Sequence, residues 1–128
     1  MLKAGEGTHL LVEMAGCQSS IMTSEEELKR ALDSLPALIG MTLILPTITK
    51  YCDAKDSIDS GISGVNILAE SHISCHLFPE RQFLYLDIFS CRTFNTEQTM
   101  DFLKEIFKPK ETEFSVIKRG KLFGKYVK

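Results

Sequence analysis

The sequence lacks an apolar run that could cross a membrane. No window of its 128 residues approaches the roughly 18 consecutive apolar residues of a transmembrane helix, and the N-terminus has no apolar signal-peptide core. A strong charge of either sign is also missing, because the formal net charge is -2 and the pI is about 5.9. This balance gives no electrostatic footprint for nucleic acid or an anionic membrane, so we expect a cytoplasmic protein with neither partner.

Cysteine is scarce and irregularly spaced. The four cysteines form no CxxC pair, which favours reduced thiols over a disulfide framework or a zinc ribbon. The sequence also has no internal repeat, and 44% apolar with 25% charged residues is ordinary for a globular protein. We therefore predict one domain over residues 1–128. Basic residues are denser near the C-terminus, which we interpret as a solvated tail with Lys118, Arg119, Lys121, Lys125 and Lys128.

The sequence does contain a regular alternation of strand-like and helix-like patterns. Thr23 or Ser24 can cap a first helix, and we expect Pro36 to end it. A second amphipathic helix begins at Asn95 or Thr96. We expect strands over residues 9–14, 41–48, 65–69, 73–78, 83–90 and 112–117.

The resulting order β-α-β-β-β-β-α-β predicts an α+β fold. We expect a two-layer α/β sandwich with a mostly antiparallel sheet and both helices on one face. Pro46 cannot donate to a strand ladder, so its strand is expected at an edge or a bulge. Residues 51–60 are polar and are interpreted as a loop that could wall a site.

Reactive side chains are concentrated between two apolar strands, in the stretch from Glu70 to Glu80. Pro79-Glu80-Arg81-Gln82 suits a hairpin connection between these strands. If Phe78 pairs with Phe83, Cys91 falls opposite Glu70 and His76 falls opposite Tyr85. One face of the hairpin is then apolar, and the other is a polar and aromatic mixture typical of a site or a subunit interface.

Ser71 and His76 are five positions apart, so an unbroken strand directs their side chains to opposite faces. A bend at Glu70–Ser71 is required if the two are to react together, and a strained or scissile peptide would supply it.

The motif AESHI..H.FPE, followed by Cys91, resembles the prokaryotic S-adenosylmethionine decarboxylase proenzyme family. The resemblance implies that the Ser71 hydroxyl attacks the carbonyl of Glu70 and that the chain cleaves itself. The products would be a β chain of residues 1–70 and an α chain of residues 71–128. Ser71 would become a pyruvoyl group, the cofactor that forms a Schiff base with the substrate, and no metal is expected.

The same resemblance implies roles for other residues. His76 would be the processing base, with Ser63 assisting, and Cys91 would be the proton donor. Glu80 would bind the ribose of S-adenosylmethionine, whose decarboxylation supplies the aminopropyl donor for spermidine synthesis. Two protomers would pack sheet on sheet in an αββα arrangement, as a homodimer or a dimer of αβ dimers.

Other interpretations remain open at this point. The substrate could be arginine or ornithine, or the chain could be a catalytically silent paralogue that regulates an active partner. Ser71 could be a simple turn residue, and Cys91 could be a small buried hydrophobe. A zinc site is disfavoured, since Cys75 and His76 are adjacent and point to opposite faces of a strand.

Overall fold

The computed structural model describes residues 6–127. Residues 1–5 and Lys128, the last residue of the predicted basic tail, lie outside the described residues. A six-stranded sheet has the order β2-β3-β4-β5-β1-β6, and every neighbouring pair is antiparallel. The strands are β1 (Gly7–Ala15), β2 (Leu43–Cys52), β3 (Gly61–Leu68), β4 (Ser71–Phe78), β5 (Phe83–Ser90) and β6 (Glu111–Arg119).

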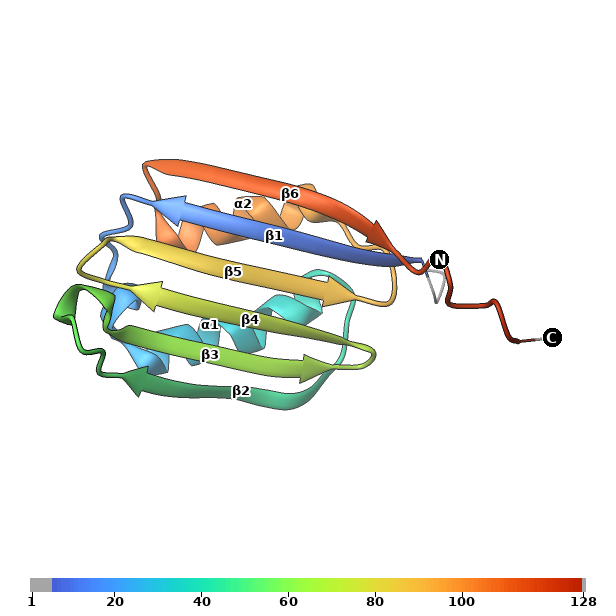
Figure 1. The fold of residues 1–128 in the computed structure, drawn as a ribbon, viewed down its shortest axis with the longest axis horizontal. Coiled ribbons are helices and arrows are strands. Elements are labelled where there is room, and N and C mark those ends of the chain that lie inside the picture. The colour runs from blue at the N-terminus through green and yellow to red at the C-terminus, as the bar shows by residue number, and fades with distance from the viewer. Residues whose placement is uncertain (1–5, 128) are drawn as a thin grey trace.

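Two helices, α1 (Glu25–Leu38) and α2 (Thr96–Phe107), cover one face of this sheet (Figure 1). Short 3-10 helices lie at Ser20–Thr23 and Ser57–Asp59. The predicted element order and the two-layer α+β sandwich are therefore confirmed. The face of the β4–β5 hairpin that was expected to be apolar lies against the helices, and its six residues are all buried: Ile73, Cys75, Leu77, Leu84, Leu86 and Ile88.

Both helices begin where the sequence predicts. The Ser24 hydroxyl accepts a hydrogen bond from the Glu27 backbone N–H at 3.1 Å, and the Asn95 side chain accepts one from the Gln98 N–H at 2.8 Å. Each cap satisfies a backbone donor that the first helical turn leaves without a partner.

The first helix does not end at Pro36, so that prediction is wrong. Helix α1 continues to Leu38, with Pro36 buried inside it. Proline lacks the N–H that would bond to the carbonyl of Leu32, four residues earlier. The side-chain amide of Asn66, which is fully buried in β3, donates to this carbonyl at 2.9 Å. A side chain from the sheet thus replaces the missing helical hydrogen bond, and it ties α1 to the sheet.

The predicted loop over residues 51–60 is also partly wrong. Strand β2 extends through Cys52, which pairs with Gly61 at the start of β3. A Cβ atom at Gly61 would lie 1.7 Å from the Leu77 carbonyl oxygen, so glycine allows this close strand approach. Pro46 does lie on an edge strand beside two register shifts, as expected.

The basic C-terminal segment is not wholly a solvated tail. Lys118 and Arg119 belong to β6, which pairs with β1. The guanidinium of Arg119 lies 4.4 Å from the centroid of the Phe89 ring, a cation–π contact. Within residues 6–127, no helix is long and apolar enough to cross a membrane.

Candidate active site

A turn of two residues, Ala69 and Glu70, joins β3 to β4, since Leu68 pairs with Ser71 across the hairpin. Glu70 has a φ of 64°, in the left-handed region that glycine favours, whereas the φ of Ala69 is not positive. This sign pattern is that of a type II turn, which calls for glycine at its second central position. The peptide bond before Ser71 therefore follows a residue held in a strained conformation.

The residues after β5 hold Glu70 at two points. The Cys91 backbone N–H donates to the Glu70 carbonyl oxygen at 3.1 Å, and the Arg92 guanidinium lies 3.0 Å from the Glu70 carboxylate. This contact confirms the predicted register, which also pairs His76 with Tyr85. The sequence reasoning did not identify Arg92, although the same register places it beside the β3–β4 turn.

Ser71 begins β4 with its side chain on the helix-facing side of the sheet. It is 8% exposed and lies opposite Ser90, which is fully buried. Because the neighbouring pair of Glu70 and Cys91 shares a backbone hydrogen bond, Ser71 and Ser90 form a non-hydrogen-bonded pair, in which side chains lie closest together. The Ser71 hydroxyl is thus largely shielded from bulk water, next to the strained peptide.

A second group of predicted residues lies on the opposite face of the sheet, which we call the open face because no helix covers it. The Ser63 hydroxyl lies 2.7 Å from His76 Nδ1, within hydrogen-bond distance, and the two residues pair directly across β3 and β4. Strand β4 runs unbroken from Ser71 to Phe78 with alternating burial. Ser71 and His76 are therefore about 16 Å apart along the strand, on opposite faces. The bend at Glu70 precedes Ser71, so it does not bring them together.

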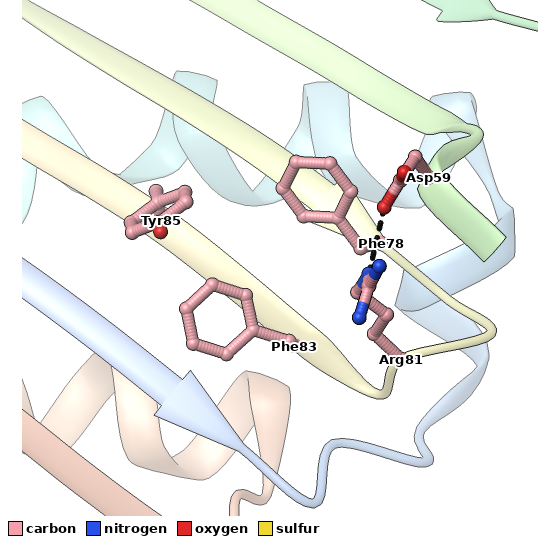
Figure 2. Close-up of a pocket in the computed structure, with 5 residues that line it drawn as sticks. All are labelled: Asp59, Phe78, Arg81, Phe83 and Tyr85. Carbon is pink, nitrogen blue, oxygen red and sulfur yellow. Dashed lines mark hydrogen bonds and ion pairs between the residues drawn. The ribbon is translucent and has the colours of Figure 1, made fainter. Parts of the chain in front are cut away.

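The structure places Glu80 still farther from Ser71, in the turn after β4. It lines a pocket of about 420 Å³ together with Tyr51 and Ser60. A neighbouring open-face pocket, of about 460 Å³, lies at the same end of the sheet (Figure 2). We call this the aromatic pocket; it is lined by Asp59, Phe78, Arg81, Phe83 and Tyr85.

The four cysteines differ in their surroundings. Burial raises the pKa of the Cys17 thiol to about 11, and it also raises the pKa of the fully buried Cys75 thiol, so both stay protonated at neutral pH. Cys91 is partly exposed and adjoins Glu70. Within the described part of the chain, no three His, Cys, Asp or Glu side chains are grouped so as to hold a metal ion.

The fold and these features together describe a small two-layer α+β sandwich protein. Its antiparallel sheet carries a serine directly after a strained residue whose carbonyl and side chain are both held by contacts. The chain matches the model of the S-adenosylmethionine decarboxylase family over residues 8–120. It belongs to this family.

Individual relatives agree with this assignment. The chain is 32% identical to an S-adenosylmethionine decarboxylase proenzyme of Methanococcus maripaludis over 115 residues, 89% of each protein. It is 34% identical to the proenzyme of Thermococcus kodakarensis over 89% of this chain and 76% of that protein. The crystal structure of the adenosylmethionine decarboxylase from Aquifex aeolicus shares the fold, with a TM-score of 0.69, 24% identity and 92% of each chain covered.

Proposed function

We propose that this chain is a self-cleaving decarboxylase of S-adenosylmethionine, the substrate given in the name of its family. Its product would be the aminopropyl donor for spermidine synthesis. The observation that carries the proposal is the environment of the Glu70–Ser71 peptide. The Ser71 hydroxyl follows Glu70, whose backbone is strained at a φ of 64°. The Glu70 carbonyl oxygen accepts the Cys91 N–H at 3.1 Å.

Self-cleavage uses these groups in order. The Ser71 hydroxyl oxygen bonds to the Glu70 carbonyl carbon, and the negative charge that develops on the carbonyl oxygen is stabilised by the Cys91 N–H. The C–N bond then breaks and a proton moves to the nitrogen, which leaves an ester. A base next removes the Cα proton of Ser71, and the Cβ–O bond breaks with Glu70 leaving as a carboxylate. Tautomerisation and hydrolysis release ammonia and leave a ketone at residue 71.

The resulting pyruvoyl group supplies a ketone that accepts the electrons left when carbon dioxide departs from the substrate. The residues around Ser71 suit such a group, because Ser71 and Ser90 are shielded from water and Cys91 is close by. We assign to the Cys91 thiol the proton that the product carbon requires.

We infer that the working unit contains two copies of the chain. His76 is about 16 Å from Ser71 in the same chain, so it cannot remove the Ser71 proton there. The open face exposes Tyr85, Ile67 and Val65 to 48%, 46% and 43%, which is typical of a surface that packs against a partner. With two sheets packed on this face, His76 and Ser63 of the partner subunit would serve the Ser71 end of the first chain.

The same arrangement accounts for the remaining residues. Glu80 and the aromatic pocket lie at the far end of the sheet from Ser71 and would face the Ser71 end of the partner. A carboxylate at Glu80 can accept the ribose hydroxyl protons. The rings of Phe78, Phe83 and Tyr85 can attract the substrate's positively charged sulfur.

The first experiment measures the intact mass of freshly purified protein under denaturing conditions, with Ser71→Ala as the control. We expect two fragments that meet at residues 70 and 71, the second with a pyruvoyl terminus, and one species near 14.4 kDa for the variant. Release of carbon dioxide is then compared for S-adenosylmethionine, arginine and ornithine. Persistent intact wild-type protein would favour a silent paralogue, and faster release from arginine or ornithine would change the substrate.

A mixing experiment tests the shared site. Chains carrying Ser71→Ala and chains carrying His76→Ala, with different tags, are produced together and separately. Neither variant should cleave well alone. In the mixture, the His76→Ala chain should be cleaved, because it keeps Ser71 and meets His76 of the partner subunit. Absence of cleavage in mixed pairs, once their formation has been verified through the tags, would contradict the shared site.

A further inference from the structure

Arg92 forms an ion pair with Glu70, the residue whose carbonyl belongs to the peptide bond that self-cleavage would break. The guanidinium Nη2 of Arg92 lies 3.0 Å from Glu70 Oε1, and the two side chains are 36% and 46% exposed. The Arg92 backbone is itself fixed, since its N–H donates to the Ser90 hydroxyl at 3.0 Å. The segment from Ser90 to Arg92 therefore holds Glu70 through both its main chain and its side chain.

This double hold acts on a residue in an unfavourable conformation. The left-handed φ of 64° at Glu70 persists in a non-glycine residue when its surroundings impose it. The Cys91 N–H fixes the Glu70 carbonyl, and the Arg92 guanidinium fixes the side chain. Losing the side-chain contact should let Glu70 relax out of this left-handed conformation.

Cleavage also changes the charge at Glu70. When the Cβ–O bond of the ester breaks, Glu70 acquires a terminal carboxylate beside its side-chain carboxylate. Two carboxylates on one residue repel each other, and the planar fork of N–H donors on arginine suits carboxylate oxygens. The guanidinium that contacts the Glu70 side chain before cleavage is thus paired with the residue that would acquire this second negative charge.

We propose that Arg92 is a positioning residue for self-cleavage. It holds Glu70 in the left-handed conformation before the peptide breaks, and it binds the carboxylate that cleavage leaves at the end of the first fragment. This role rests on the self-cleavage proposed above.

The test compares Arg92→Ala with Arg30→Ala, a control that removes another exposed arginine–carboxylate ion pair, 2.8 Å long, with Glu26 on α1. Chains made by cell-free translation are followed by mass as the fragments appear. We expect the rate constant of self-cleavage to fall about two- to five-fold in Arg92→Ala, the range that an exposed ion pair supports, and to stay unchanged in Arg30→Ala. Arg92→Lys should cleave faster than Arg92→Ala. Added salt should reduce the difference in cleavage rate between Arg92→Ala and wild type.

A second assay examines the cleaved protein in its native state. Carboxypeptidase treatment removes Glu70 from the end of the first fragment, and its loss is measured by mass. We expect faster loss of Glu70 in Arg92→Ala than in wild type and Arg30→Ala. If Arg92→Ala does not fold, Arg92→Gln, which keeps most of the side chain and loses its charge, replaces it.

The outcomes separate this role from the proposed function. If wild-type protein never cleaves, both are overturned. If wild type cleaves and Arg92→Ala matches it, the role before cleavage is wrong. If Glu70 is equally resistant to carboxypeptidase in both proteins, the role after cleavage is wrong.

Discussion

The two turns that flank β4 use similar backbone devices. Glu70 precedes the strand with a φ of 64°, and Gln82 lies in the turn that follows it with a φ of 54°. Both carbonyl oxygens accept a main-chain N–H, from Cys91 at 3.1 Å and from Cys17 at 2.9 Å. Each turn also has an arginine–carboxylate pair nearby.

The difference lies in the residue that comes next. Ser71 follows Glu70, whereas Phe83 follows Gln82 and has no nucleophile to offer. The turns differ in length as well, with two residues before β4 and four after it. If the Glu70–Ser71 bond is the one that cleaves, as we propose, a strained residue with a hydrogen-bonded carbonyl is not sufficient by itself. A hydroxyl must follow it, and a base must reach that hydroxyl residue.

The largest expected effect comes from removing the proposed base, a change that leaves both turns intact. His76→Ala should slow self-cleavage by about 10²- to 10⁴-fold, the usual contribution of a positioned proton acceptor. Ser63→Ala should have a smaller effect in the same direction, because it removes the hydroxyl 2.7 Å from His76 Nδ1. Fragment formation is followed by mass. An unchanged rate of self-cleavage in His76→Ala would show that Ser71 reacts without His76.

The next prediction concerns stability at the β4–β5 end. Gly61→Ala places a Cβ 1.7 Å from the Leu77 carbonyl oxygen, so backbone must move. We expect the free energy of unfolding to fall by about 2–3 kcal/mol, measured by urea denaturation of the Ser71→Ala background. Gly124→Ala, where a Cβ meets nothing within 4 Å, is the control. An equal fall in both variants would contradict the close-approach explanation.

The smallest expected effect applies one substitution to both turns. Gln82→Gly and Glu70→Gly each relieve a positive φ, and each should raise the free energy of unfolding by up to about 1 kcal/mol. Cleavage should slow in Glu70→Gly alone, because the strain that aligns its carbonyl is lost. Urea denaturation and fragment mass are measured in parallel. Equal cleavage rates in the two variants would contradict the proposed difference between the turns.

The sequence predicted the framework of the fold well, for identifiable reasons. Periodicity and capping residues such as Ser24 and Asn95 act locally, so the element order and both helix starts were correct. The predicted helix end at Pro36 was wrong, because the side chain that replaces the missing hydrogen bond, that of Asn66, comes from a strand 30 positions later. Residues 49–52 and 61–64 were not predicted as strand, because their pattern is polar or glycine-rich and pairing with the neighbouring strand overrides it.

The candidate site was predicted less completely. The hairpin register correctly placed Cys91 beside Glu70, because it follows from strand pairing alone. The ion pair of Arg92 with Glu70 depends on side-chain conformation, which periodicity does not specify. Strand geometry separates His76 from Ser71 within one chain. The pattern of a single sequence does not indicate the second copy of the chain that we propose brings these two residues together.

The strand order has a final consequence for a chain cut between Glu70 and Ser71. Strands β1, β2 and β3 would belong to one fragment, and β4, β5 and β6 to the other, yet β1 lies between β5 and β6, and β3 adjoins β4. The fragments are therefore interleaved at three strand–strand boundaries. They could not separate without global unfolding, and after unfolding they would have to find each other by diffusion. Their melting temperature should then rise with protein concentration, which the uncut Ser71→Ala chain would show less strongly.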